Sequence, residues 1–567
     1  MTRPARGFGL VAVPAVGPAL RAARTRARVA FGRYELCFAG VVAVGLVLRV
    51  VELPAKPFHH DESEHAWFTW LLVTGHGYHY DPVFHGPLQF YVMSLLYLLI
   101  GAGDLAARLG PALVGTVLVA LPYLLRRQIG RVGALAAAVV LCLSPSFLYF
   151  SRFVREDIYA ACLTFALVAA IFRFLAHPRT WHPSVIFGLL AMSFATKETT
   201  YITVFIFGLF FAGLAAWELR TGRRTREGSV IRAVRQVGRD AWIWAVATFA
   251  TVFMLLFTTF LTNPHGLQDG IVESIRYWLS QQPVARGGQP WFYYLVILPG
   301  YEWPVLLLAL VGVVAVVRRP TVLGVFLIWT FAASLVVYSW ASERMPWLIL
   351  HPLLPAVLLA GMGFQTLWGA RGKVVGKAVL AVVAIGAVYS IQAAVNLAYV
   401  RPADPRELLV YTQTSTDVPN VAAELGFLSR TAPDRLHRPL RLEVDSWGGT
   451  GWPWGWYLRD VPTAYPDMSG IDYSPTSDVV VVAEPSQPRL AGRLRDYTGR
   501  RFRLRVWWVP DWGGASLTDW ARWLLLRRRW GPEGTMDEWL YLRRSLCDAR
   551  ATCARERPAQ ARGTAGS

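Results

Sequence analysis

Long apolar runs recur along the first 400 residues of this 567-residue chain, and they constrain its fold more than any other feature. A backbone inside lipid must satisfy its own hydrogen bonds, and helices that cross the membrane do so. Hydrophobic residues make up 54% of the chain. We therefore predict a polytopic α-helical membrane protein.

Eleven of these runs are predicted to cross the membrane. They lie at residues 34–52, 108–125, 131–149, 158–176, 184–196, 199–218, 241–262, 302–317, 321–340, 346–364 and 375–397. A further run at 88–102 reaches only about 22 Å as a helix, short of a hydrocarbon core of about 30 Å. We predict that this run lies on the membrane surface or re-enters the membrane without crossing it.

The arginines predict the orientation, because cytoplasmic loops carry an excess of basic residues. Residues 1–33 contain seven arginines and no acid, and no A-x-A-like site follows the first apolar run, so an uncleaved cytoplasmic arm is expected rather than a signal peptide. Seven more arginines mark residues 220–240 as a cytoplasmic loop. The loop at 53–86 then lies outside. So does the loop at 263–301, whose Tyr293-Tyr294 suits an interfacial aromatic belt.

The composition changes after residue 397, where the predicted transmembrane domain (34–397) ends. Apolar runs shorten and charges mix, so residues 398–554 are predicted to form an extracytoplasmic α/β domain, on the same side of the membrane as the loop at 53–86. Residues 420–430 are expected to be helical, and strands are expected at 479–482 and 501–508. The tail at 555–567 is predicted to be disordered.

The loop at 53–86 carries a dense group of ionisable side chains. It holds six of the eleven histidines together with Asp61, Glu62, Glu64 and Asp81. Such a group is costly to keep beside lipid, which favours a functional site. The alternative is a polar loop that happens to be rich in histidine.

Other charged groups are predicted to lie at the same membrane depth. The four outer constellations are Asp61-Glu62, Arg152/Arg155/Glu156/Asp157, Lys197-Glu198 and Glu343-Arg344. Singly, each has a plain structural explanation: Lys197-Glu198 suits an ion pair at a helix end, and Arg155 suits an interfacial anchor. Jointly, four charged groups at one depth favour function.

Acids and bases on one face suit sugar transfer from a lipid-phosphate donor. A carboxylate takes the proton of the acceptor, and cations stabilise the charge that grows on the departing phosphate, so no general acid is required. The predicted roles are catalysis for Asp61 and Glu62, donor-phosphate binding for His85, Arg152, Arg155, Lys197 and Arg344, and support for His60, Asp157, Glu198 and Glu343.

The order of these motifs resembles the GT-C membrane glycosyltransferases, with the protein O-mannosyltransferase-like and aminoarabinose transferase-like branches closest. The motifs are Asp61-Glu62, His85-Gly86-Pro87-Leu88, Arg108-Leu109, Ser144-Pro145 to Arg152 with Asp157, and Lys197-Glu198. More narrowly, the chain resembles the flippase activity-associated proteins of archaea and bacteria. That match is carried by His60-Asp61-Glu62, Lys197-Glu198-Thr199, Met345-Pro346-Trp347, Trp452-Pro453-Trp454 and Trp456 to Asp460.

The resemblance implies a polyprenyl-phosphate-sugar donor, inversion at the anomeric carbon, and Asp61 as the matched catalytic acid position. It also implies a multi-pass protein of a prokaryotic cytoplasmic membrane. The expected partners are the lipid-linked sugar, membrane lipid and a glycan, lipid or protein acceptor, with no nucleic acid. The alternative function is a non-catalytic carrier that assists the flipping of lipid-linked glycans.

A divalent metal stays open as a cofactor. Carboxylate-plus-histidine sets bind Mn²⁺, Mg²⁺ or Zn²⁺, and the candidate ligands are His60, Asp61, His65 and Asp157. The histidines of this loop do not form the His-Glu-x-x-His motif of zinc proteases. Some relatives in the wider class use a metal to organise the donor phosphate and others do not. The two alternatives are therefore a site that holds a divalent metal and a site that works without one.

Overall fold

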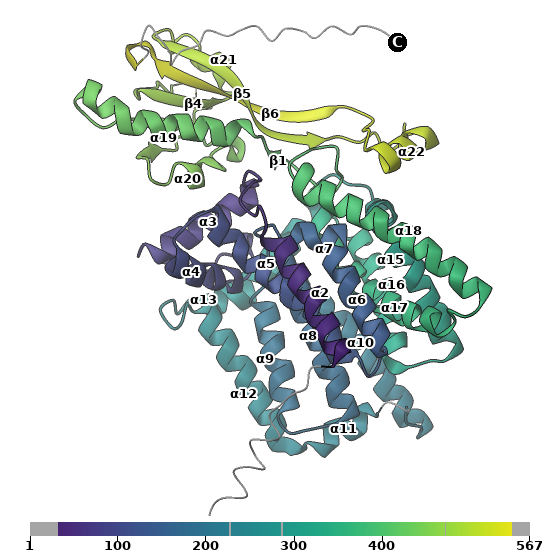
Figure 1. The fold of residues 1–567 in the computed structure, drawn as a ribbon. Coiled ribbons are helices and arrows are strands. Elements are labelled where there is room, and N and C mark those ends of the chain that lie inside the picture. Colours follow the sequence, from purple (N-terminus) through teal and green to yellow (C-terminus); the bar gives the residue numbers. More distant parts are fainter. Residues whose placement is uncertain (1–31, 226–227, 285–286, 471, 547–567) are drawn as a thin grey trace, which may run out of the picture.

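The computed structural model describes residues 32–546 apart from 226–227, 285–286 and 471 (Figure 1). The predicted basic arm at 1–33, except its last two residues, and the predicted tail at 555–567 lie outside the described residues. A helical region comes first along the chain, and a smaller domain built on a β-sheet follows it.

The helical region extends to residue 400. Its first half contains α2 (Arg33–Val50), α3 (His60–Val73), η1 (Pro82–Phe84), α4 (Leu88–Ile100), α5 (Asp104–Ala120), η2 (Leu121–Leu125), α6 (Arg131–Leu143), α7 (Pro145–Phe150), α8 (Asp157–Ala176), α9 (His182–Phe194) and α10 (Thr199–Thr221). Its second half contains α11 (Val230–Gln236), α12 (Gly238–Phe257), α13 (Gly266–Gln268), η3 (Asp269–Glu273), α14 (Ser274–Gln281), η4 (Gln282–Val284), α15 (Tyr293–Arg318), α16 (Val322–Trp340), η5 (Pro346–Ile349), α17 (Leu350–Gly369), α18 (Val374–Val395) and η6 (Asn396–Val400).

Each of the eleven predicted spans contains a helix. Eight helices of the described chain are long and apolar enough to cross a membrane, and α4, α6 and α9 are shorter apolar helices. The predicted class, a polytopic helical membrane protein, is confirmed, while the count of eleven spans stays a prediction. The run predicted not to cross forms α4, which has 13 residues and packs against α3 and α5.

Small residues bring the central helix α17 close to its neighbours. A Cβ atom added at Gly312 of α15 would lie 2.0 Å from the carbonyl oxygen of Leu359, and one added at Gly363 would lie 2.1 Å from that of Leu308. Backbones this close leave no room for a side chain, which is how helices associate in lipid without a hydrophobic driving force. Gly133 and Gly361 bring α6 and α17 together in the same way.

Helix α15 differs from the prediction. It begins at Tyr293 instead of residue 302, and it kinks at Glu302, where φ is −124°, between Pro299 and Pro304. The expectation that Tyr293-Tyr294 belongs to an interfacial belt is wrong. Both rings are buried, and their hydroxyls donate to the carbonyls of Leu408 and Met345 at 2.9 Å.

The C-terminal domain is a six-stranded sheet with helices on both faces. Its elements are β1 (Gln413–Thr414), α19 (Asp417–Leu436), β2 (Leu442–Val444), η7 (Trp447–Gly449), α20 (Trp454–Tyr457), β3 (Thr463–Ala464), β4 (Val479–Ala483), α21 (Gln487–Leu490), β5 (Tyr497–Trp508), α22 (Leu517–Leu526), β6 (Glu533–Arg543) and η8 (Arg544–Leu546). The strand order is β1-β5-β6-β4-β2-β3. The predicted helix and both predicted strands are confirmed as parts of α19, β4 and β5.

Strand β4 has a continuous run of valines because both of its faces are covered. Side chains alternate between the faces of a strand. Val479 and Val481 pack in the core beneath α19, whereas Val480 and Val482 pack in the core beneath α21, beside Leu490. The sheet is thus the middle layer of the domain.

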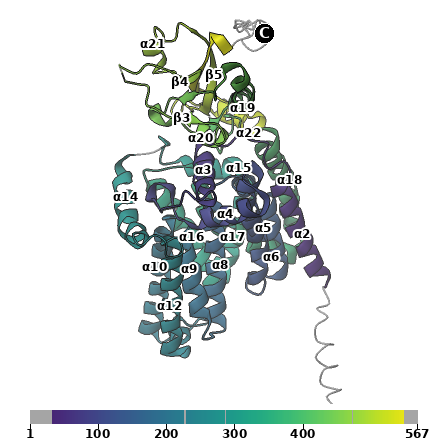
Figure 2. The same cartoon turned by 90° about the vertical axis from the view of Figure 1, so that its left-hand side faces the viewer.

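The C-terminal domain lies over the end of the helical region at which α3 and α4 are found (Figures 1 and 2). Trp456 of α20 is buried beside Phe58, and its indole N–H donates to Asp104 at 2.8 Å. At a second contact, the indole N–H of Trp523 in α22 donates to the carbonyl of Arg406 at 3.0 Å, and its ring lies against Gly300 of α15.

Candidate active site

Helix α3 begins at the ionisable loop because His59 and Glu62 cap it. His59 Nδ1 accepts the N–H of Asp61 at 3.2 Å, and Glu62 Oε2 accepts the N–H of His59 at 3.0 Å. This capping box satisfies N–H groups that the first turn leaves free. Asp61 and Glu62 therefore lie in the first turn and point about 100° apart.

Glu62 points into the protein. Its side chain is 0% exposed, and it accepts Arg108 Nε and Nη2 at 2.8 Å each and the N–H of Val154 at 3.0 Å. Burial raises the pKa of Glu62, but Arg108 and Lys56 outweigh burial and lower that pKa to about 2. Arg108 also donates to the carbonyls of Leu53, Lys56 and Pro57, which fixes the segment that leads into α3.

Asp61 points into a cavity of about 410 Å³ between the helical region and the C-terminal sheet. Its side chain is 16% exposed, and Oδ1 lies 2.9 Å from His60 Nε2. Burial, together with Arg505 and Arg155, lowers the pKa of His60 well below its usual value, so the ring beside Asp61 is neutral. The cavity is lined by His60, Asp61, Glu64, His65, Val83, Phe84, His85, Arg155, Trp278, Gly287, Glu343, Met345, Trp347, Tyr411, Thr412, Arg505, Trp507 and Met536.

Arg155 is the central cation of this cavity. It donates from Nη1 to Asp61 Oδ2, its Nε lies 3.5 Å from Asp157 Oδ2, and its guanidinium stacks 4.0 Å from the ring of Trp347. Arg155 therefore joins the first loop to the start of α8.

His85 holds Arg155 from the other side. Since a guanidinium only donates, His85 Nε2 accepts Arg155 Nη2 at 3.2 Å, and Nδ1 donates to Glu198 Oε2 at 2.7 Å. The ring also stacks on Trp278, with centroids 5.0 Å apart. Gly86 makes this position reachable, because a Cβ there would lie 2.2 Å from the carbonyl oxygen of Ala195.

Asp157 and Lys197 form a buried ion pair behind Arg155. Lys197 Nζ lies 2.7 Å from each carboxylate oxygen of Asp157, and both side chains are buried. Neither residue lines the cavity. The structure thus links Asp61, Arg155, Asp157 and Lys197 in one chain of contacts, with Lys197 farthest from the cavity.

Besides Lys197, two more of the predicted phosphate ligands do not line the cavity. Arg152 donates to the carbonyls of Leu48, Arg49, Val51 and Glu52 at 2.6–3.2 Å and so caps the end of α2. Arg344 is similarly engaged with backbone and does not line the cavity. It donates to the carbonyls of Ser339 and Gln289 at 2.9 and 2.8 Å, while its neighbour Glu343 does line the cavity.

Most ligand atoms that could hold a divalent ion already have hydrogen-bond or ion-pair partners in the protein. Ligand atoms of His59, His60 and Asp61 lie within 4.8 Å of one another. However, His59 Nδ1 accepts the N–H of Asp61, His59 Nε2 donates to the carbonyl of Tyr411 at 2.9 Å, and Arg155 occupies Asp61 Oδ2. His60 Nε2 and Asp61 Oδ1 remain, fewer than the roughly four ligands that Zn²⁺ usually takes.

The other predicted metal ligands also have partners. His65 Nδ1 lies 2.6 Å from the carbonyl of Asp61, and His65 Nε2 lies 2.6 Å from Glu156 Oε1. Asp157 is paired with Lys197. These residues do not by themselves fit a bound divalent ion.

The C-terminal sheet supplies cavity residues that the sequence analysis missed. Arg505 of β5 lines the cavity and donates from Nη2 to the carbonyls of Gly449 and Trp452 at 2.8 and 2.9 Å. Its Nε is buried without a hydrogen-bond partner, and it forms no ion pair with a described carboxylate. Within the predicted strand, no local signal separates Arg505 from the other arginines.

Aromatic residues also line the cavity. Only the tertiary structure identifies them as cavity residues. Trp278, Trp347, Tyr411 and Trp507 come from four separate segments. Flat aromatic faces offer apolar surface with a polar edge, which suits a ligand with both kinds of group.

Comparisons with known proteins agree with this fold. The family model for dolichyl-phosphate-mannose-protein mannosyltransferase matches residues 84–223, a segment that includes His85, Arg155 and Asp157. A search of the sequence against curated proteins finds no significant match.

Two solved structures resemble the chain over most of its length. ArnT from Cupriavidus metallidurans, solved bound to undecaprenyl phosphate, has a TM-score of 0.59 and 16% identity, with 90% of this chain and 98% of ArnT covered. The oligosaccharyltransferase of Archaeoglobus fulgidus in the apo form has a TM-score of 0.50 and 13% identity, with 80% and 70% covered. The chain therefore has the fold of the GT-C membrane glycosyltransferases, as the sequence resemblance implies. The narrower resemblance to flippase activity-associated proteins stays a prediction.

Proposed function

We propose that this chain is a membrane glycosyltransferase that moves a sugar from a polyprenyl-phosphate donor to an acceptor outside a prokaryotic cytoplasmic membrane. The observation that carries the proposal is Asp61, a carboxylate that points into a 410 Å³ cavity beside Arg155 and Arg505. The GT-C fold and the undecaprenyl phosphate bound to ArnT support the choice of donor. The acceptor is a glycan, a lipid or a protein.

Arg505 and Arg155 are the proposed ligands of the donor phosphate. Arg505 has no carboxylate partner in the described chain and keeps an unpartnered Nε, so it is ready for an anion. Arg155 is paired with Asp61, and a donor phosphate competes for that guanidinium. Binding of the donor then releases Asp61 from Arg155 and makes its carboxylate free to accept a proton.

The proposed reaction is a single displacement. The acceptor O–H gives its proton to Asp61, and the acceptor oxygen attacks the anomeric carbon from the face opposite the phosphate. The bond between that carbon and the phosphate oxygen breaks, and its electron pair leaves with the polyprenyl phosphate. Arg505 and Arg155 stabilise this charge, and the anomeric centre is inverted.

Several predicted residues are proposed to act by positioning others. His60 orients Asp61, the His85–Glu198 pair orients Arg155, and Asp157 with Lys197 supports Arg155 from behind. Glu62 holds α3 in place, and Glu343 borders the acceptor space. The backbone contacts of Arg152 and Arg344 favour structural roles for both.

The test is transfer of a radiolabelled sugar from polyprenyl-phosphate donors by the full-length protein in membrane vesicles. Asp61→Asn is expected to lower the rate about 10²–10⁴-fold, as loss of a general base does, while the donor is still retained. Asp81→Asn is the matched control: Asp81 lies in the same loop, caps η1 through the N–H of Val83 and does not line the cavity.

Full transfer by Asp61→Asn would show that Asp61 is not the base. If the wild type transfers no sugar from any donor yet moves lipid-linked glycans across the vesicle membrane, the non-catalytic carrier becomes the function.

A further inference from the structure

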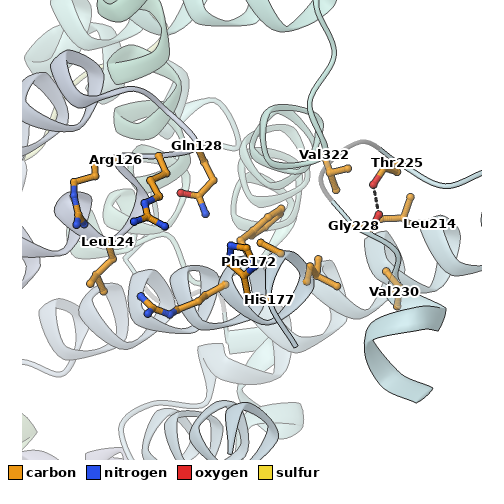
Figure 3. A pocket seen from close by; sticks show the side chains of 14 residues that line it. Leu124, Arg126, Gln128, Phe172, His177, Leu214, Thr225, Gly228, Val230 and Val322 are labelled. Carbon is orange, nitrogen blue, oxygen red and sulfur yellow. Dashed lines mark hydrogen bonds between the residues drawn. The ribbon is translucent and has the colours of Figure 1, made fainter. Parts of the chain in front are cut away.

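A second cavity lies at the opposite end of the helical region from the C-terminal domain. It has a volume of about 330 Å³ and is formed where η2, α8, α10 and the start of α11 come together (Figure 3). Helix α8 connects the two sites: Asp157 is at one end, and Arg173 follows 16 residues later. At 1.5 Å per residue they are about 24 Å apart, so one headgroup does not occupy both cavities.

The polar side of this second cavity is basic. Arg126, Arg127, Arg173 and His177 line it. Among the residues that the structure describes, no acidic side chain lines the cavity and none of the three arginines pairs with a carboxylate. Arg126 donates from Nη1 to the carbonyl of Tyr123 at 2.7 Å and stacks on that ring at 3.7 Å, which fixes the guanidinium at the rim. Guanidinium groups that line one cavity and have no acidic partner are suited to a phosphate group.

One described acid that reaches the start of α11 already has hydrogen-bond partners. Glu218 of α10 accepts the hydroxyl of Ser229 at 2.7 Å and the N–H groups of Val230 and Ile231 at 3.1 and 3.2 Å. Its carboxylate therefore anchors the start of α11 and does not line the cavity. The positive charge at the rim stays available to a ligand.

The remaining wall is apolar and lies beside lipid-facing surface. It is formed by Leu124, Phe172, Leu175, Leu214, Val230 and Val322. Helix α10 carries Leu214, and only 17% of the residues in its most apolar stretch are buried. Most of its surface is therefore left for lipid. A cavity that joins guanidinium groups to an apolar wall at such a helix suits a charged head with a hydrocarbon chain.

We propose that this cavity binds the phosphate headgroup of an anionic membrane lipid, with part of the lipid chain against Phe172 and Leu214. Basic pockets between helices at a membrane surface recognise anionic headgroups in this way. The site lies at the surface predicted to be cytoplasmic, and the proposal does not depend on sugar transfer at Asp61.

The experiment measures retention of dioleoyl phosphatidic acid by the full-length protein in phosphatidylcholine nanodiscs, using native mass spectrometry. R126Q/R127Q/R173Q is expected to bind the lipid about 100-fold more weakly, because each basic residue near the surface contributes roughly fivefold. The control is R318Q/R319Q, a basic pair at the end of α15 that does not line the cavity, and it should bind as the wild type does.

A second variant and a competitor complete the test. Leu214→Trp fills the apolar side without changing charge and is expected to weaken phosphatidic acid binding while the protein elutes as the folded wild type does. Excess inorganic phosphate should not displace the lipid; if it does so completely, the site serves free phosphate and the lipid assignment is wrong. Equal retention by the wild type and R126Q/R127Q/R173Q overturns the proposal.

Discussion

Asp61 and Glu62 are neighbours in sequence with opposite surroundings. Asp61 is 16% exposed and faces a cavity, whereas Glu62 is 0% exposed and faces Arg108. Because α3 starts immediately before them, the helical turn sends one side chain outward and the other inward. One carboxylate is thus free for chemistry while the other stabilises the helix that carries both.

Glu62→Gln is predicted to destabilise the protein strongly. Arg108 cannot lose its proton, so the substitution leaves a buried guanidinium without its counter-charge, which costs about 3–5 kcal/mol. Thermal unfolding of the purified protein should show a much lower midpoint. Glu64→Gln is the matched control, since Glu64 is on the same helix and makes no hydrogen bond with the described residues. Equal midpoints for the two variants would contradict the role given to Glu62.

Arg505→Gln is predicted to weaken donor binding about tenfold or more, because a hydrogen bond to a charged group is worth roughly 1.5–3 kcal/mol. Titration of a polyprenyl-phosphate sugar measures this as a raised Kd. Arg503→Gln is the control: Arg503 lies on the same strand but pairs with Glu533 at 3.1 Å, away from the cavity. If Arg503→Gln weakens the donor as much as Arg505→Gln does, Arg505 is not a specific phosphate ligand.

At the scale of elements, contacts between helix ends place the site. Helix α3 meets the residue before α8 through His65 and Glu156, whose Nε2 and Oε1 atoms lie 2.6 Å apart. The segment before α4 meets the end of α9, where Leu88 donates to the carbonyl of Ala195 at 2.8 Å. These junctions bring Asp61, His85 and Arg155 to one cavity.

The His65–Glu156 contact makes stability depend on pH. Burial lowers the pKa of His65, but the Glu156 carboxylate outweighs burial and raises it above 6.5. The contribution of His65 is therefore complete below pH 6.5 and is lost as pH rises through the raised pKa. Glu156 has a lowered pKa, so its contribution is lost only in acid.

The measurement compares thermal midpoints of the wild type and His65→Gln between pH 6 and 9. The advantage of the wild type should be largest at pH 6 and should shrink as pH rises. The difference between the two proteins isolates His65, because burial lowers the pKa of Lys56 to about 7 and Lys56 titrates in the same range. A difference that stays constant with pH would mean that His65 does not titrate in the folded protein.

At the scale of the whole molecule, the cavity exists because two parts of the chain meet. The helical region supplies Asp61, His85 and Arg155, and the sheet supplies Arg505, Trp507 and Met536. Trp456 and Trp523 hold the sheet domain at two separate places on the helical region. They belong to α20 and α22, which lie at different places along the sheet domain (Figure 1). A site closed by a second domain can exclude water from the reacting groups.

The two ends of the molecule are predicted to lie on opposite sides of the membrane. In a background with Cys37, Cys547 and Cys553 replaced by serine, Val234→Cys should react with a membrane-impermeant maleimide only after the membrane is opened. Leu517→Cys should react in intact cells. Both positions are exposed, at 41% and 89%, so accessibility reports the side of the membrane. Labelling of Val234→Cys in intact cells would reverse the orientation.

The sequence by itself determined the class of fold and the position of its elements. Apolar run length and the need to satisfy backbone hydrogen bonds in lipid are local properties, so α5, α8, α10, α12, α16 and α17 lie close to their predicted spans. The same holds for β4 and α19, whose patterns repeat within a few residues. The loop that contains Asp61 was also predicted as a candidate site. A dense group of ionisable residues beside an apolar run can be recognised from the sequence without any tertiary contact.

Only the tertiary structure decided which charged residues meet in the cavity. Arg152 and Arg155 lie three positions apart in one charged stretch, yet Arg152 caps α2 and Arg155 contacts Asp61. Arg505 resembles the other arginines of its strand and reaches the cavity because the C-terminal domain docks over α3. Sequence periodicity assigns a side chain to a face of its own helix or strand. The partner across that face comes from a distant segment, and packing between segments selects it.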